Sequence, residues 1–273
     1  MRWQLEAGLA IDRAVRRRAA TESIPFAEGL VLRHPELADV HYLNALMLDC
    51  ARAPAGADEV VALAEQWLSD RPDRHVVFDD AAAGERIAAE LAPAGWERRR
   101  TTFMVITGSG GGVRPDPRGR RISEAELRGL QLAGIREDLS DVDARSGLPE
   151  RLVATQAALR AGTCARAFGA DDEGRLASTG TLFLDQDLHG RRVAMLDEVG
   201  TLRAHRQRGL ARAVITAAIA EAHVWGAELT VVPADSDDWP QLIYARLGFA
   251  PAGRQVALTL RSRPASGSGS GAL

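Results

Sequence analysis

The feature that most constrains this fold is a strand–loop–helix–strand unit within residues 193–232. Residues 193–202 have the apolar pattern of a strand, and an apolar face at helical spacing follows Gly209. Gly226 is suited to the C-terminus of that helix, and residues 228–232 predict a short buried strand. The unit indicates a mixed α/β domain.

Helix and strand signals also alternate on either side of this unit. Ser123 and Glu126 have the spacing of a capping box, which predicts a helix that continues to about residue 137. A second helix is expected after Pro149. Strands are expected at residues 164–170, 176–184 and 255–260, a turn at 171–174, and a short helix at 240–247. The predicted fold class is therefore α/β with a mixed sheet.

All 34 basic residues of this 273-residue chain are arginine, and there is no lysine. A Schiff-base enzyme, a Walker P-loop and a protein kinase each need a lysine, so these classes are excluded. The net charge of −3, with both signs interspersed, gives no support for nucleic-acid binding. The runs Arg16-Arg17-Arg18 and Arg98-Arg99-Arg100 are expected to be solvated faces.

The cysteines and the apolar runs bear on the cellular location of the protein. Cys50 and Cys164 are far apart and form no Cys/His cluster, which argues against a metal site and favours a reduced, cytoplasmic protein. The charged N-terminus does not resemble a signal peptide. No apolar run is long enough to span a membrane, so no membrane partner is expected.

One segment has the composition of a linker. Residues 108–121 combine a glycine run with two prolines and few apolar side chains. They predict a first domain at residues 1–107 and a second at 122–262. Residues 263–273 end in Ser-Gly repeats and are expected to be a disordered tail.

The loop before the helix at Gly209 is suited to an anion. The first amides of a helix have no intrahelical partner, and the helix dipole is positive there. Gly209 permits close backbone approach, while Arg206, Arg208 and Arg212 add positive charge. A pyrophosphate would fit this turn. The alternative is an ordinary strand–helix turn with solvated arginines.

Two motifs resemble the GNAT N-acetyltransferases. Residues 206–211, Arg-Gln-Arg-Gly-Leu-Ala, are similar to that family's acyl-CoA loop, and residues 242–249 are similar to its Leu-Tyr-x-x-x-Gly-Phe signature. The resemblance covers about residues 122–262. It implies acetyl-CoA as co-substrate, with the backbone of Val199 and Thr201 along the pantetheine arm. The implied pyrophosphate-binding residues are Arg206, Gln207, Arg208, Gly209, Leu210, Ala211 and Arg212.

Acetyl transfer to an amine needs a base and an acid. Adjacent carboxylates on a strand point to opposite faces, and the resemblance favours Asp197 as base because it shares parity with Val199 and Thr201. Glu198 is the alternate base. Alternatively, one or both carboxylates only end a strand or pair with the nearby Arg191 or Arg203. Tyr244 matches the family's acid, which protonates the leaving thiolate.

Residues 237–240, Asp-Asp-Trp-Pro, depart from the family pattern. Asp237 stands where the family often has an asparagine that contacts CoA, and Pro240 replaces an alanine. This puts the contact between Asp237 and CoA in doubt. Trp239 is expected either to line the acceptor cleft or to pack.

The first half resembles a truncated copy of the second. Residues 75–78, a helix ending before Gly95-Trp96, and residues 102–106 repeat the order strand, helix, Gly-aromatic, strand. Leu91 falls at the position of Tyr244, and no acyl-CoA loop precedes residues 58–68. The resemblance is to the tandem arrangement of mycothiol synthase-like proteins, with a degenerate N-terminal GNAT-like domain. An unrelated small α/β domain is the alternative.

These features favour an acetyl-CoA-dependent N-acetyltransferase acting on the primary amine of a small molecule. The alternatives are a non-catalytic acyl-CoA-binding or sensing protein and, more weakly, a different phosphate binder. Neither the acceptor nor the oligomeric state follows from the sequence.

Overall fold

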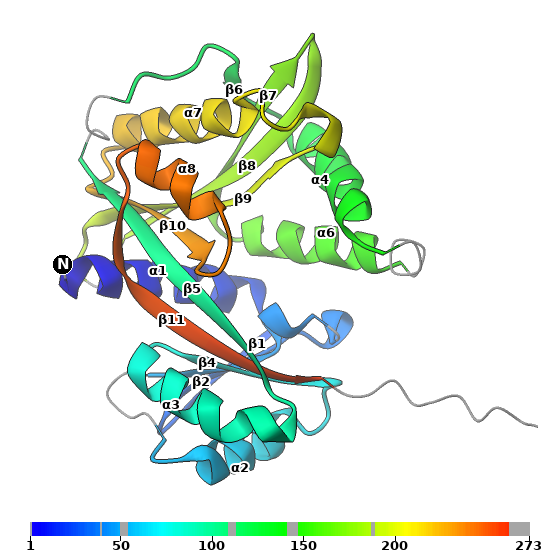
Figure 1. Cartoon of the computed structure of the whole chain (residues 1–273), viewed down its shortest axis with the longest axis vertical. Coiled ribbons are helices and arrows are strands. Elements are labelled where there is room, and N and C mark those ends of the chain that lie inside the picture. The colour runs from blue at the N-terminus through cyan, green and yellow to red at the C-terminus, as the bar shows by residue number, and fades with distance from the viewer. Residues whose placement is uncertain are drawn as a thin grey trace, which may run out of the picture.

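The computed structural model describes residues 2–38, 40–49, 54–108, 113–140, 147–186 and 189–261. Its strands form one eleven-stranded sheet in the order β1-β2-β3-β4-β11-β5-β10-β9-β8-β7-β6. The sheet contains parallel and antiparallel pairs. The predicted mixed α/β class is confirmed (Figure 1).

The first half of the chain supplies one end of the sheet and the long strand β5. Its elements are α1 (Arg2–Ala19), β1 (Glu22–Phe26), β2 (Gly29–Arg33), β3 (Ala45–Leu48), α2 (Ala57–Leu68), β4 (Asp73–Phe78), α3 (Ala81–Leu91) and β5 (Glu97–Thr107). The helix α1 has no counterpart among the elements expected from the sequence.

The second half supplies the other end of the sheet and β11. Its elements are β6 (Gly119–Arg121), α4 (Glu124–Asp138), α6 (Leu148–Arg160), β7 (Cys164–Asp172), β8 (Arg175–Gln186), β9 (Arg192–Thr201), α7 (Leu210–Trp225), β10 (Leu229–Asp235), α8 (Pro240–Arg246) and β11 (Ala250–Arg261). The helices and strands expected here are confirmed, and the capping box of Ser123 and Glu126 begins α4 as predicted.

The two halves exchange their last strands. β5, from the first half, pairs with β10 and β11, whereas β11, from the second half, pairs with β4 and β5. Figure 1 shows these two long strands crossing between the upper and lower parts of the molecule. Each half also has the order strand, helix, parallel strand, helix, strand, as β3-α2-β4-α3-β5 and β9-α7-β10-α8-β11. The proposed division into domains 1–107 and 122–262 stays a prediction.

Two helices cover opposite faces of the central strands. Alternate residues of β9, such as Ala194 and Leu196, pack in the same cluster as α7, whereas Val193 and Met195 pack with α1. Alternation of side chains along a strand produces this division. The expectation that Arg16 belongs to a solvated face is wrong, because Arg16 is 8% exposed.

Part of the predicted linker is held against α7. The backbone N–H of Asp116 donates to Thr216 Oγ1 at 3.1 Å. Gly119 lies so close to the helix that a Cβ there would stand 2.3 Å from the carbonyl oxygen of Ala213. The glycine run at 109–112 and the expected tail at 263–273 lie outside the described residues.

Candidate active site

A cavity of about 1330 Å³ lies between β9 and the helices α4, α6, α7 and α8. It forms where two parallel strands separate. β9 and β10 pair only from Val193–Met195 to Leu229–Val231, and β9 then continues beside β8 alone. The end of β9 therefore leaves one backbone edge without a neighbouring strand, beside the cavity.

Ten of the thirteen site residues expected from the sequence line this cavity. They are Glu198, Val199, Thr201, Arg206, Gln207, Gly209, Leu210, Ala211, Arg212 and Tyr244. Asp197, Arg208 and Asp237 do not line it.

The loop before α7 presents backbone donors to the cavity. Gln207 and Gly209 have positive φ angles of 64° and 79°, which turn the chain sharply into the helix. Within the described residues, the N–H groups of residues 207–212 donate to no acceptor, whereas that of Ala213 donates to the Gly209 carbonyl at 3.1 Å. Six consecutive donors at a helix N-terminus are chemically suited to a pyrophosphate.

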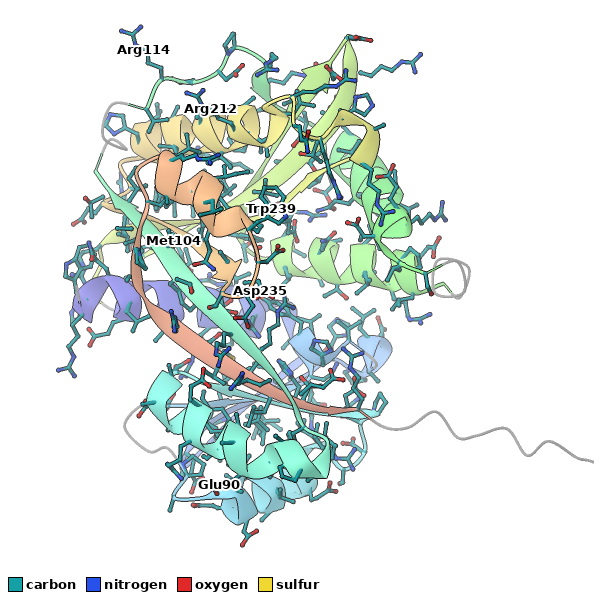
Figure 2. All side chains as sticks on the ribbon, viewed as in Figure 1. Glu90, Met104, Arg114, Arg212, Asp235 and Trp239 are labelled. Carbon is teal, nitrogen blue, oxygen red and sulfur yellow. The ribbon has the colours of Figure 1, made fainter. Side chains whose placement is uncertain are left out.

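Ion pairs hold two of the three arginines in and after this loop, Arg206 and Arg208. Arg206 donates to the Thr201 carbonyl at 3.0 Å and to Asp138 at 3.1 Å. Arg208 donates to Asp172 at 2.7 Å, outside the cavity. Arg212 is exposed and forms no ion pair with the described residues; Figure 2 shows it on α7, away from the sheet. Arg212 is therefore the loop cation most available to an incoming phosphate.

A β-bulge in β9 lies at Glu198. Its φ is +57°, and the pairing of β9 with β8 shifts between Thr179 and Thr181. One extra residue of β9 is accommodated there, so strict side-chain alternation does not continue from Asp197 to Val199. Before the bulge, alternation puts Glu198 on the face of Leu196 and Asp197 on the face of Met195; the bulge then brings Val199 to the cavity beside Glu198, and Asp197 does not line it.

The Glu198 carboxylate is buried, with 5% of its side chain exposed. Its Oε2 accepts from Thr181 Oγ1 at 2.6 Å, Arg160 Nη1 at 2.8 Å and Gln131 Nε2 at 2.9 Å. Its Oε1 is buried and has no hydrogen-bond partner among the described residues. Burial raises the pKa of Glu198 to about 7, although Arg160 opposes this rise. Such a carboxyl group can exchange a proton near neutral pH.

Asp197 lies beside a buried polar cluster from the first half. Its Oδ1 accepts from the backbone N–H of Glu198 at 2.7 Å, and burial raises its pKa to about 6. Asp12 raises this pKa further, while Arg16 lowers it. Arg16 in turn pairs with Asp12 at 3.0 Å and lies 3.7 Å from the centre of the Tyr42 ring.

Tyr244 lies on α8 and is 7% exposed. Burial, with a smaller contribution from Asp197, raises its pKa well above the ordinary value of 10.0. The hydroxyl group therefore stays protonated at neutral pH. The ring contacts Phe249 edge to face, with centroids 5.8 Å apart, so the Gly-Phe end of the predicted signature packs against the tyrosine.

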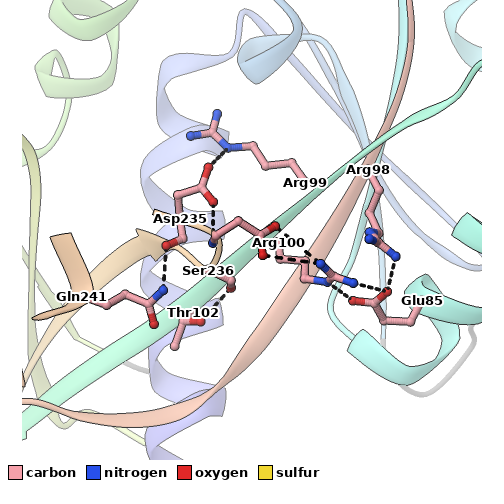
Figure 3. A network of polar contacts seen from close by, with 9 residues as sticks. Glu85, Arg98, Arg99, Arg100, Thr102, Asp235, Ser236 and Gln241 are labelled. Atoms are coloured by element: carbon pink, nitrogen blue, oxygen red, sulfur yellow. Dashed lines mark hydrogen bonds and ion pairs between the residues drawn. The ribbon is translucent and has the colours of Figure 1, made fainter. Parts of the chain in front are cut away.

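Asp237 faces a different network. Its carboxylate lies 3.4 Å from Arg100 Nη1, and Arg100 also pairs with Glu85. Figure 3 shows Arg100 directed toward Glu85, with Arg99 paired to Asp235 nearby. Trp239, two residues later, is 61% exposed and does line the cavity (Figure 2).

Three partners of Glu198 carry no motif in the sequence. Gln131, Arg160 and Thr181 come from α4, α6 and β8 and converge only in the fold. No sequence signal distinguishes Arg160, because an arginine in the last turn of a helix is usually solvated. In the structure, however, Arg160 is only 8% exposed.

Two negative findings apply to the described residues. No group of three or more His, Cys, Asp or Glu side chains could hold a metal ion. In the same residues, no helix is both long enough and apolar enough to cross a membrane.

Comparisons with known proteins bear on the family and the fold. A family model described as the acetyltransferase (GNAT) family matches residues 133–249. No curated protein matches the chain.

Solved structures match over nearly the whole chain. A GCN5-related N-acetyltransferase from Kribbella flavida has a TM-score of 0.60 and 21% identity, covering 95% of this chain and 96% of its own. A conserved protein of unknown function from Staphylococcus epidermidis has a TM-score of 0.64 and 10% identity, covering 89% and 94%. At these identities the likeness concerns the fold. Residues 133–249 match the acetyltransferase (GNAT) family, and over nearly the whole chain the fold is similar to these solved structures.

Proposed function

We propose that this protein transfers the acetyl group of acetyl-CoA to the primary amine of a small molecule. One observation carries the proposal: a single cavity is lined by the α7 loop, by Tyr244 and by Glu198. An anion-binding turn, a proton donor and a proton acceptor thus share one space. Direct transfer from a thioester to an amine requires these three components.

The proposed co-substrate fits the residues present. The free N–H groups of residues 207–212 suit the pyrophosphate, and exposed Arg212 supplies a positive charge. The unpaired edge of β9 near Val199 suits the amide-containing pantetheine arm, because that edge has no neighbouring strand there. Bound in this way, acetyl-CoA would supply the thioester.

Glu198 is the proposed base. It lines the cavity, has an oxygen with no hydrogen-bond partner among the described residues, and has a pKa raised to about 7. Asp197, favoured by sequence parity, lies outside the lining and faces Asp12 and Arg16. We assign Asp197 a positioning role, since it accepts the backbone N–H of Glu198 at the bulge.

Tyr244 is the proposed acid. Glu198 accepts one proton from the ammonium group, and the freed nitrogen lone pair forms the C–N bond as the C–S bond breaks. Tyr244 donates its hydroxyl proton to the sulfur and recovers the second proton that the nitrogen loses on becoming an amide. The net reaction releases one proton, which leaves through Glu198.

Release of free thiol from acetyl-CoA, measured with a panel of amines, amino acids, aminoglycosides and peptides, tests this proposal. We expect turnover with at least one amine, and Glu198→Gln should lower kcat by about 10²-fold or more. Asp197→Asn should retain much more activity than Glu198→Gln. The reverse order would reassign the base to Asp197. Tight acetyl-CoA binding without turnover of any amine would instead favour the non-catalytic binding protein.

A further inference from the structure

Three side-chain oxygen atoms of residues that line the cavity lack hydrogen-bond donors within the described part of the chain. They are Oε1 of Glu198, Oε1 of Gln131 and Oε1 of Gln156, each buried and without a partner among the described residues. All three side chains line the cavity, and Gln131 is only 7% exposed. They come from β9, α4 and α6: Gln131 is hydrogen-bonded to Glu198, and Gln156 lies one helical turn before Arg160, which also binds Glu198.

The hydrogen-bond network sets the orientation of Gln131. Its Nε2 donates to Glu198 Oε2 at 2.9 Å, because a carboxylate can only accept. The carbonyl oxygen of the amide is therefore the atom left without a donor. A buried acceptor without a partner is destabilising, so three of them in one wall favour a guest that brings several donors.

The other described lining side chains of α4 and α6 are mostly apolar, and none of them is cationic. Leu130 and Ile135 of α4, its C-cap Leu139, and Leu152 of α6 line the cavity as well, and Asp138 of α4, which also lines it, is paired with Arg206. Arg160, behind this wall, is already paired with Glu124 and Glu198.

We propose that this part of the cavity selects a primary ammonium group on an apolar body without a neighbouring carboxylate, and that Gln131, Gln156 and Glu198 receive its N–H donors. The inference rests on the proposed acetyl transfer and names its acceptor class. An ammonium group has three donors and no acceptor, which matches three oxygens without donors. An α-carboxylate would meet acceptor oxygens and no counter-charge, so α-amino acids are disfavoured.

In this role Gln131 and Gln156 are positioning residues. They hold the ammonium nitrogen beside the Glu198 carboxyl group, which takes its proton. The four apolar side chains contact the body of the acceptor. Selectivity therefore comes from the pattern of donors and from the absence of a cation that could bind a carboxylate.

Matched substrate pairs test the acceptor class with the full-length protein. Phenethylamine and phenylalanine share a ring and a chain but differ by the α-carboxylate, and pentylamine and norleucine form a second pair. We expect kcat/KM for each amine to exceed that of its amino acid by at least about tenfold. Equal turnover within the pairs, or turnover confined to amino acids or aminoglycosides, would overturn the acceptor class but leave the acetyl transfer standing. No turnover with any amine would reject both proposals.

Three variants test the positioning residues. Gln131→Met and Gln156→Met each remove an oxygen at similar volume, and we expect KM for phenethylamine to rise about tenfold, as for a lost hydrogen bond to a charged group. KM for acetyl-CoA should stay within about twofold, because the α7 loop is untouched. Gln156→Glu retains an acceptor and should restore amine binding.

Gln186→Met, an exposed position on β8 that does not line the cavity, is the matched control and should leave both KM values unchanged. Urea unfolding of each variant separates a folding defect from weakened amine binding. Unchanged KM for the amine in both Gln131→Met and Gln156→Met would overturn the assignment of these residues.

Discussion

Glu198→Gln should lower the rate of the reaction and, at higher pH, raise the folding stability relative to the wild type. The substitution keeps the size of the side chain but removes its ability to take a proton. In the wild type, burial raises the pKa of this group from its ordinary value of 4.5 to about 7. The folded state therefore holds a proton that the unfolded chain releases at lower pH, and folding becomes less favourable as the pH rises through this window.

The size of this effect follows from the two pKa values. One pKa unit corresponds to about 1.4 kcal/mol, so between about pH 5 and about pH 8 the wild type should lose about 2 to 3 kcal/mol of stability through this group. The variant should not show this loss of stability, because glutamine does not titrate. Hydrogen bonds changed by the substitution, such as the one from Thr181, add an offset that is nearly independent of pH and cancels in the comparison between pH values.

Urea unfolding of both proteins at about pH 5 and about pH 8 measures the stability difference, and thiol release with the best amine measures the activity. From about pH 5 to about pH 8, the free energy of unfolding of the variant should rise by about 2 to 3 kcal/mol relative to that of the wild type. Its kcat should be lower by about 10²-fold or more. Wild-type kcat/KM should rise with pH through an apparent pKa of about 7, and the variant should lack this step. Parallel stability profiles for the two proteins would refute the burial of an ionisable group at this position.

Three further substitutions give separate outcomes. Tyr244→Phe should lower kcat by about 10²-fold or more while the Kd of CoA changes by less than about twofold, and an unchanged kcat would remove the tyrosine from the reaction. Gly209→Glu, at a φ of +79°, should raise the Kd of CoA at least about tenfold because it adds strain and negative charge to the loop, and unchanged binding measured by calorimetry would place the phosphates elsewhere. Gly119→Ala should destabilise the fold by about 1 to 3 kcal/mol in urea unfolding, because its Cβ would meet Ala213. Gly129→Ala, in open space on α4, is the control and should be neutral or stabilising by up to about 1 kcal/mol; equal losses in both would contradict the close approach to α7.

Local signals were sufficient to predict most elements of the second half. The capping box at Ser123, the apolar face after Gly209 and the turn at residues 171–174 each depend on residues close together in the chain, and each appears as expected. The loop before α7 is of the same kind, because helix-terminal amides and adjacent arginines belong to one continuous segment. The burial of Arg16 was not predictable in this way, since its partners Asp12 and Tyr42 meet it only through the packing of α1.

The carboxylate at the cavity depends on tertiary structure. Parity along β9 favoured Asp197, but a bulge against β8 changes the phase of the strand after Glu198 and brings Val199 to the cavity beside Glu198, not beside Asp197. The raised pKa of Glu198 likewise comes from its burial in the folded chain, and its partners Gln131 and Arg160, which come from distant helices, limit the rise.

The sequence by itself thus determined the class of fold and the loop before α7, and it singled out Tyr244 as the candidate acid, because these depend on local periodicity and on motifs of neighbouring residues. Only the tertiary structure decided which carboxylate lines the cavity and which oxygens there lack donors. It also decided that β11 completes the sheet between β4 and β5. Strand register and the convergence of α4, α6 and β9 are long-range properties, which no local pattern specifies.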